Sequence, residues 1–250
     1  MIEIRLGSRP QERREERFAD GAVTVRSRKG VRAAERGLLD ALPRDKEGSA
    51  LVVNSIEGLA GMVLRALNPG LRVHCHFDDA WDFEAAQRTV DRHPDLAPCL
   101  AVAADPPEGP WDLVVLPVEQ DDPTDLVRER LRDAVGWLTP TGLLIGSTSN
   151  PKDRFLREEI RAVFGPPTIV EGKTRTTGTT YIARAPGEPG NLRGPGARTF
   201  TVREEQAELT FVSRPGVFCY GRLDAGSRTL LEHLDVGETR RILDLGCGTG

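Results

Sequence analysis

The sequence has few cysteines and no long apolar run, and each scarcity excludes a class of protein. Its four cysteines, Cys75, Cys99, Cys219 and Cys247, form no C-x-x-C pair and no zinc-ligand spacing, so we expect reduced, buried or incidental thiols. No apolar run is long enough to span a membrane, and the charged amino terminus lacks the apolar core of a signal peptide. The sequence therefore predicts a cytoplasmic protein with no membrane partner.

An excess of positive charge is also missing. The net charge is −4 and the pI is near 5.7, so the chain as a whole does not attract nucleic acid electrostatically. Any RNA binding must use a local patch. The best candidate is the run Arg26, Arg28, Lys29, Arg32 and Arg36, for which a solvated basic face is the alternative interpretation.

Strand and helix patterns alternate over most of the chain, after a charged start (residues 1 to about 20) that we expect to be frayed. Apolar runs predict strands at 23–25, 51–53, 71–77, 99–104, 111–116, 142–146, 168–171 and 179–183. Helical spacing predicts helices at 31–42, 59–67, 83–93, 126–138 and 154–164, with an acidic turn at 78–82. Parallel strand–helix units closed by an antiparallel pair indicate a doubly wound α/β domain.

The most informative stretch is the last one, 241–250, which reads R-I-L-D-L-G-C-G-T-G. It predicts a buried strand that runs into a glycine turn, where a ligand can approach the backbone because no Cβ is in the way. Such a turn lies at the carboxyl ends of the strands, where open α/β sheets bind ligands. A dinucleotide fingerprint, G-x-G-x-x-G, would place its acidic residue about 20 positions downstream. Here the acid precedes the glycines, although a nicotinamide site and an accidental turn remain open.

The pattern D-x-G-x-G-x-G resembles the first motif of class I S-adenosylmethionine-dependent methyltransferases. The resemblance implies S-adenosylmethionine as cofactor, held by Asp244, Gly246, Cys247, Gly248 and Gly250. It also implies that Phe218 walls the cofactor pocket, for which a core aromatic is the alternative. We expect Asp224 and Ser227 to cap the helix before the last strand.

The earlier part of the chain resembles the same family with its site lost. Leu138-Thr139-Pro140-Thr141-Gly142 stands in the place of the family's L-x-P-x-G turn. However, 54–58 reads N-S-I-E-G where the family has its glycines, and 116–119 reads L-P-V-E where amine-methylating members have N-P-P-[FYW]. We therefore expect weak or absent cofactor binding here. Asp78 and Asp105 follow predicted strands and leave a retained nucleotide pocket open, with ordinary turn residues as the alternative.

Two histidines, His74 and His76, would project from one face of a strand. Two ligands do not make a metal site and no third is visible, so no metal is expected.

An internal repeat indicates tandem domains. The order of 25–31, 38–42 and 51–53 recurs at 211–217, 230–234 and 242–244. Between the copies lies a glycine- and proline-rich linker. The predicted organisation is a degenerate methyltransferase-like domain at 1–185, a linker at 186–198 and the start of a catalytic domain at 199–250.

Tandem class I domains of which the first is degenerate resemble the bacterial ribosomal RNA guanine-N2-methyltransferases. The matching residues include Pro215-Gly216-Val217-Phe218 and Leu223-Asp224-Ala225-Gly226-Ser227. The resemblance implies methylation of a guanine amine in ribosomal RNA or an assembling ribosomal subunit, within a doubly wound, mostly parallel α/β fold. We also expect a chain that continues past Gly250, because a first strand and its glycine loop cannot form a domain alone. The N-P-P-[FYW] motif of the second domain is missing, so no catalytic residue is assigned. The alternative is a non-catalytic module that binds RNA or protein.

Overall fold

The computed structural model describes residues 2–7, 14–171, 178–186, 196–204, 207–235, 237, 241–243 and 245. The chain divides into two compact units. The first comprises Met1–Asp122 and Leu131–Leu192, and the second comprises Pro123–Arg130 and Arg193–Gly250.

The first unit is organised around a seven-stranded sheet with the order β6-β5-β4-β7-β8-β10-β9. Its strands are β4 (Gly48–Val53), β5 (Leu71–Phe77), β6 (Cys99–Val102), β7 (Trp111–Val118), β8 (Leu138–Thr148), β9 (Thr168–Glu171) and β10 (Thr179–Arg184). Strands β4 to β8 are parallel, and β10 pairs antiparallel with both β8 and β9. The predicted doubly wound, mostly parallel sheet is therefore confirmed. Its strand order reverses between β4 and β7, the position at which such sheets bind ligands.

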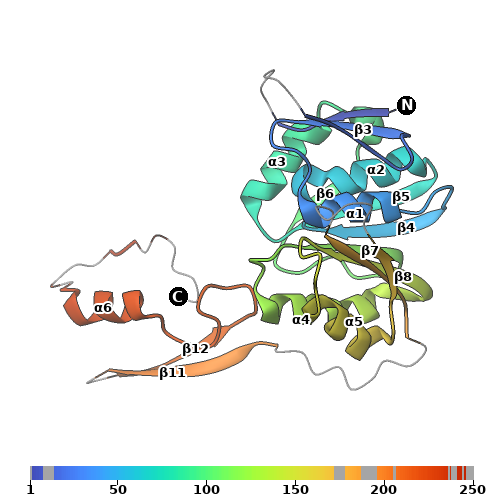
Figure 1. The fold of residues 1–250 in the computed structure, drawn as a ribbon. Helices are drawn as coiled ribbons and strands as arrows, with labels where there is room; N and C mark the ends of the chain where they lie inside the picture. Colours follow the sequence, from blue (N-terminus) through green and yellow to red (C-terminus); the bar gives the residue numbers. More distant parts are fainter. Residues whose placement is uncertain are drawn as a thin grey trace. The chain divides into compact units, whose positions relative to one another are not determined.

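Helices cover both faces of this sheet (Figure 1). The helices are α1 (Ala33–Ala41), α2 (Leu59–Leu67), α3 (Ala80–Val90), α5 (Phe155–Phe164) and the part of α4 (Thr124–Trp137) from residue 131 on, with single 3₁₀ turns at Ile56–Gly58 and Pro94–Leu96. Alternate residues of β4 separate the two sides: Ala50 and Val52 join the core beneath α1, α2 and α3. Leu51 and Val53 are equally buried and, by strand alternation, face the other side.

The amino terminus is not frayed, contrary to the sequence prediction. It forms a second sheet of β1 (Ile2–Arg5), β2 (Arg14–Phe18) and β3 (Val23–Ser27), in the order β1-β3-β2. The alternation of Ile2, Ile4 and Leu6 with charged residues is a strand signal that the high charge density obscured. Ile4, Leu6 and Phe18 are buried in the main core, so burial of this face holds the segment in place.

Two further boundaries differ from the prediction. Helix α3 begins at Ala80 and not at Phe83, because the Asp79 carboxylate accepts hydrogen bonds from the amides of Trp81 and Asp82 and caps the helix. The predicted acidic turn is therefore mostly the first turn of α3. Strand β8 begins at Leu138, and the expected turn at 139–142 is an irregularity within it, since the register jumps from Trp111↔Leu138 to Leu113↔Leu143.

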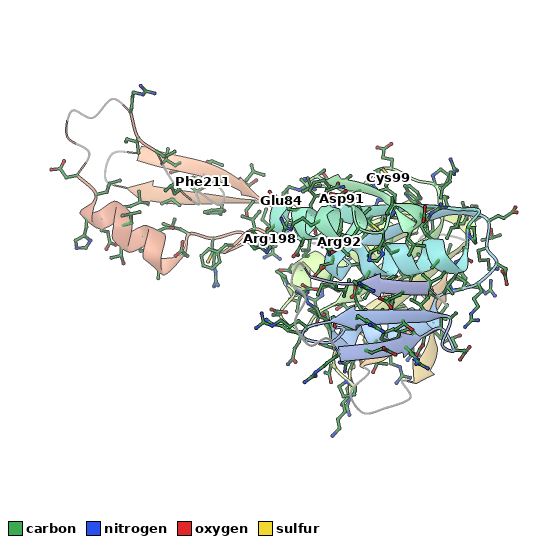
Figure 2. The ribbon with its side chains drawn as sticks, turned by 90° about the horizontal axis from the view of Figure 1, so that it is seen from above. Glu84, Asp91, Arg92, Cys99, Arg198 and Phe211 are labelled. Carbon is green, nitrogen blue, oxygen red and sulfur yellow. The ribbon has the colours of Figure 1, made fainter. Side chains whose placement is uncertain are left out.

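The second unit contains the hairpin of β11 (Arg198–Glu204) and β12 (Ala207–Ser213), followed by α6 (Ala225–His233). Strand β11 was not predicted. Its Phe200 stacks on Phe211 of β12 with ring centroids 5.3 Å apart, and Figure 2 labels Arg198 and Phe211 on the two strands. Most of the predicted linker lies outside the described residues. Among the described helices, none combines the length and the apolar character needed to cross a membrane.

The junction of β1 with the end of α3 predicts a pH-dependent stability. The amide of Arg5 donates to Nε2 of His93 over 3.0 Å, and burial, with the charges of Arg92 and Arg5, lowers the pKa of His93. A histidine whose folded pKa lies below its unfolded value stabilises the fold above the unfolded pKa, and this contribution is lost as the pH falls. We expect the contribution of His93 to the free energy of unfolding to decline below about pH 6.5, and His93→Gln to remove this contribution from the pH dependence. Urea unfolding between pH 5 and 8 tests this, and equal slopes in both proteins would contradict it.

Candidate functional site

The predicted glycine loop lies outside the described residues: this holds for Asp244, Gly246, Cys247, Gly248 and Gly250. The run before it can be described, and it is not the buried strand that we predicted. Ile242 and Leu243 are 66% and 81% exposed and form no strand. No strand in the described part of the second unit pairs with them. An apolar run becomes a buried strand only when neighbouring strands and covering helices accept it.

The predictions for the helix cap at Asp224 and for Phe218 have different outcomes. Asp224 caps α6, accepting from the amides of Gly226 (2.8 Å) and Ser227 (3.2 Å), so the predicted cap is confirmed. The Ser227 hydroxyl donates to the same carboxylate, and this bond is the main cause of the lowered pKa of Asp224. Phe218 is 77% exposed, so it is not a core aromatic among the described residues. Its role in a cofactor pocket stays a prediction.

In the first unit, the carboxyl ends of the central strands form the edge of the sheet at which such folds bind ligands. Polar side chains at this edge form hydrogen bonds with one another. Asn54, directly after β4, has a left-handed φ of 54°. Its side-chain Nδ2 donates to the Asp78 carboxylate over 2.8 Å, and its side-chain Oδ1 accepts from the Asp78 backbone amide over 3.0 Å. Asp78 also contacts the buried His76, 3.1 Å from Nε2. The carboxylate that could have held a ribose is therefore engaged within the protein, which favours the turn-residue interpretation of Asp78.

A buried glutamate of α1 accepts hydrogen bonds from the turn that follows β4. Oε1 of Glu35 accepts from the Ser55 hydroxyl (2.6 Å) and the Ile56 amide (2.9 Å). The Ser55 oxygen in turn accepts from the amide of Ala60 in α2 over 2.9 Å. Glu35 is only 1% exposed. Sequence analysis overlooked it, although its spacing of three and four residues from Leu38 and Leu39 places it on the apolar face of the helix.

Burial determines the ionisation of Glu35. Desolvation raises its pKa to about 8, against smaller opposing effects of the Ser55 and Ile56 hydrogen bonds and of the charge of Arg32. Its Oε2 has no hydrogen-bond partner among the residues that the structure describes. The side chain is therefore mostly neutral at pH 7, which avoids placing an unpaired charge in the core.

Glu57, which stands within the expected glycine positions, also has a left-handed φ, of 48°. Its carboxylate accepts hydrogen bonds from within the protein. Oε2 accepts from the Gly7 amide over 2.9 Å and from the Thr89 hydroxyl of α3. Glu57 thus connects the amino-terminal sheet and α3 to the turn.

The turn after β4 therefore has little left to offer a ligand. The amides of Asn54, Ile56 and Gly58 donate to His76 O (2.8 Å), Glu35 Oε1 (2.9 Å) and Ser55 O (3.0 Å). A methyltransferase loop needs backbone donors and the absence of side chains at this place. The residues present do not fit S-adenosylmethionine in this unit.

The predicted basic patch is largely neutralised. Arg26 forms ion pairs with Glu3 and Glu15, and Arg36 with Glu16. Arg32 is the main charge opposing the raised pKa of Glu119. Arg28 and Lys29 are exposed. The surface therefore carries charges of both signs and is not a concentrated cationic patch. It gives only weak support to RNA binding.

His74 and His76 lie in different environments. His76 is fully buried against Asp78, whereas His74 is half-buried with its ring 5.9 Å from that of Trp111. In the described part of the chain, no three His, Cys, Asp or Glu side chains are grouped so as to hold a metal ion.

Comparison with known proteins connects both units to methyltransferases. Residues 208–250 match the family model of the methyltransferase small domain. The ribosomal RNA small subunit methyltransferase C of Alcanivorax borkumensis is 32% identical over 219 residues, covering 80% of this chain and 59% of that protein. The protein of the same name from Stutzerimonas stutzeri is 56% identical over 54 residues, covering 22% of this chain and 16% of that protein. The chain thus spans at most about three fifths of these relatives.

Among solved structures, the Thermus thermophilus 16S rRNA N2 G1207 methyltransferase (RsmC), in complex with AdoMet and guanosine, matches with a TM-score of 0.53 and 23% identity. The match covers 76% of this chain and 49% of that one. The fold is the class I methyltransferase fold, as the strand order indicates.

The buried Glu35 yields a test of how the turn is closed. A carboxyl whose folded pKa is about 8 binds a proton that the unfolded chain has lost, so stability is full at low pH and falls as the pH rises from about 4.5 to 8. One such group contributes a slope of at most about 1.4 kcal/mol per pH unit. Glu35→Gln keeps an acceptor for Ser55 and Ile56, and it should remove this slope of the free energy of unfolding against pH. Glu35→Leu leaves both donors unpaired and should be less stable than Glu35→Gln at every pH, by about 1–3 kcal/mol. Denaturant unfolding from pH 4.5 to 8.5 measures both; an unchanged slope in Glu35→Gln would refute a neutral Glu35.

Proposed function

We propose that this sequence belongs to an S-adenosylmethionine-dependent methyltransferase that methylates the exocyclic amine of a guanine in small-subunit ribosomal RNA. The observation that carries the proposal is the glycine motif Asp244–Gly250 inside the segment that matches the methyltransferase small domain. The similarity to ribosomal RNA small subunit methyltransferases C supports the RNA substrate. The Thermus enzyme, in complex with AdoMet and guanosine, supports the cofactor and the base. A ribosomal RNA substrate also implies work in the cytoplasm, on free RNA or an assembling subunit.

The proposed division of labour follows the predicted domains. Residues 1–185 form a methyltransferase-like domain that serves as a scaffold and as a surface that orients RNA. Residues 186–198 are a linker, and 199–250 begin the catalytic domain. The closed turn after β4 supports this division, because the amides of Asn54, Ile56 and Gly58 are already bonded within the protein.

The bound cofactor supplies an electrophilic methyl group, and no covalent enzyme intermediate is needed. The protein's contribution is positioning and exclusion of water. Gly246, Gly248 and Gly250 allow close approach of the backbone, Asp244 fixes the loop and polar groups of the ligand, and Phe218 shields one side. A target guanine in structured RNA has to be unstacked to reach the pocket.

The second candidate function is a non-catalytic module that binds RNA or protein. The first unit favours it, since its turn does not fit a cofactor. The two functions differ in whether the natural gene product binds S-adenosylmethionine through the glycine motif.

We predict that the natural gene product binds S-adenosylmethionine and that Gly248→Val abolishes binding, because a β-branched side chain fills the space that the cofactor needs to reach the backbone. Isothermal titration calorimetry measures the affinity. Asp78→Asn is the matched control: it alters the corresponding edge of the first unit and should leave the affinity unchanged. Binding that survives Gly248→Val, or that is lost in Asp78→Asn with the fold intact, would rule out the assigned site.

A further inference from the structure

A pocket lies at the opposite edge of the first unit's sheet, where β7 and β8 begin. The segment 103–110, which connects β6 to β7, contains no helix. Its prolines at 106, 107 and 110 disfavour one. Between this segment and the end of α4 is a pocket of about 800 Å³, walled in part by Glu108, Pro110, Arg132, Trp137 and Pro140. This volume lies in the range of small-molecule sites.

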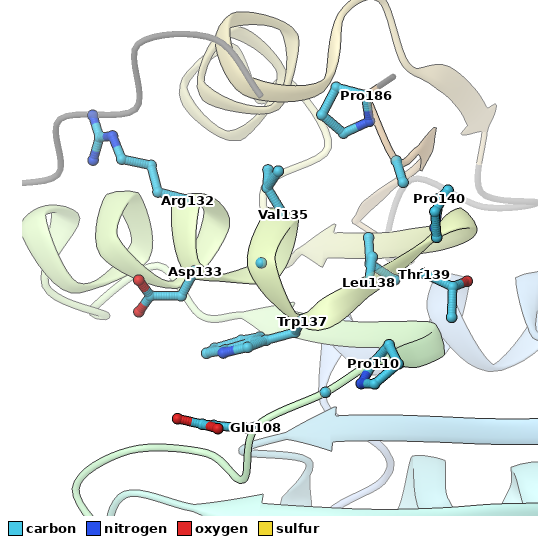
Figure 3. Close-up of a pocket in the computed structure, with 13 residues that line it drawn as sticks. Glu108, Pro110, Arg132, Asp133, Val135, Trp137, Leu138, Thr139, Pro140 and Pro186 are labelled. Atoms are coloured by element: carbon cyan, nitrogen blue, oxygen red, sulfur yellow. The ribbon is translucent and has the colours of Figure 1, made fainter. Parts of the chain in front are cut away.

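The pocket has a preformed aromatic wall. Trp137, the last residue of α4, is half-buried and lines the pocket. The facing loop is fixed against it, because a Cβ on Gly109 would lie 2.3 Å from the Trp137 carbonyl oxygen. Only glycine permits this approach. Figure 3 shows the side chains of Glu108 and Trp137 projecting to the same side of the pocket.

The charged groups of the pocket have unused hydrogen-bonding capacity. Glu108 is exposed and forms no hydrogen bond or ion pair with the described residues. Arg132 also lines the pocket and forms no ion pair with the described residues. An indole face, the carboxylate of Glu108 and the side chain of Arg132 thus line one cavity.

This combination matches one ligand chemistry. An indole face stacks on a planar heterocycle, a carboxylate accepts two parallel N–H bonds, and an arginine pairs with a phosphate. Guanine presents two such N–H donors on its Watson–Crick edge, whereas adenine does not. We propose that this pocket binds a guanine nucleotide, either free or as an unpaired residue of an RNA chain. The RNA form rests on the proposed function, whereas binding of the free nucleotide does not.

Nuclear magnetic resonance titration of the full chain tests the proposal. The three indole N–H signals, from Trp81, Trp111 and Trp137, report on the pocket and on sites outside it. GMP is added to about 10 mM, ten times the dissociation constant of a millimolar site. We expect GMP to shift the Trp137 signal, and AMP to bind at least about tenfold more weakly. The Trp81 signal should not move.

Variants assign the contacts. Trp137→Ala, in which backbone amide signals of the pocket replace the lost indole signal as the readout, should weaken GMP binding about tenfold or more. Glu108→Gln should remove the preference for GMP over AMP. Glu84→Gln, on the exposed face of α3, is the matched control and should change neither. Backbone spectra verify that each variant is folded.

A short oligoribonucleotide with one unpaired guanine separates the two sources. Competition between it and GMP at the Trp137 signal supports an RNA residue, and binding of GMP alone supports the free nucleotide. No shift of Trp137 with either probe, or equal GMP affinity in Trp137→Ala, would overturn the site. Equal affinities for GMP and AMP in the unaltered chain would overturn the guanine assignment.

Discussion

The backbone amides of the turn after β4 must each find an acceptor, and the first unit depends on how that requirement is met. In a ligand-binding loop such donors remain available to the ligand. Here Glu35 from α1, the carbonyl of His76 in β5 and the backbone carbonyl of Ser55 accept the amides of Ile56, Asn54 and Gly58. The hydroxyl of Ser55 accepts the amide of Ala60 in α2. Glu35, His76 and the Ser55 hydroxyl each tie another element to the turn. The Glu57 carboxylate extends the network to α3 and to the amino-terminal sheet. The same bonds that hold these elements together remove the donors that a cofactor would use.

The network also explains why an acidic side chain is tolerated in the core. Glu35 is held by two hydrogen bonds to one oxygen, and its raised pKa leaves it mostly neutral at pH 7. A methyltransferase fold therefore persists in the first unit with its ligand edge converted to internal structure. The segment that matches the methyltransferase small domain, 208–250, lies in the other unit. Under the proposed function, one fold serves twice, first as a scaffold and then as a cofactor-binding domain.

Local patterns predicted the sheet well because its strands are short apolar runs separated by turn residues; helix α2 and strand β5 have the predicted bounds. The wrong predictions lie where tertiary contacts determine whether a segment forms a strand or where a helix begins. Charged residues in β1 and β2 obscured strands that are held by buried Ile4 and Phe18. The start of α3 depends on the Asp79 cap, and the predicted strand at 242–244 lacks neighbours among the described residues. Glu35, Asn54 and Asp78 come from separate elements, so no single stretch of sequence indicates their network. The same holds for Glu108 and Trp137.

Hydrogen–deuterium exchange of the natural gene product, with and without S-adenosylmethionine, tests the central claim most directly. The claim is that the turn after β4 is closed by the protein itself and that the glycine motif alone receives the cofactor. Peptides that cover 54–60 should exchange slowly and equally in both conditions, while peptides that cover 244–250 should gain protection when the cofactor is added. Cofactor-dependent protection of 54–60 would contradict the claim, because it would show that the first unit has kept a working site.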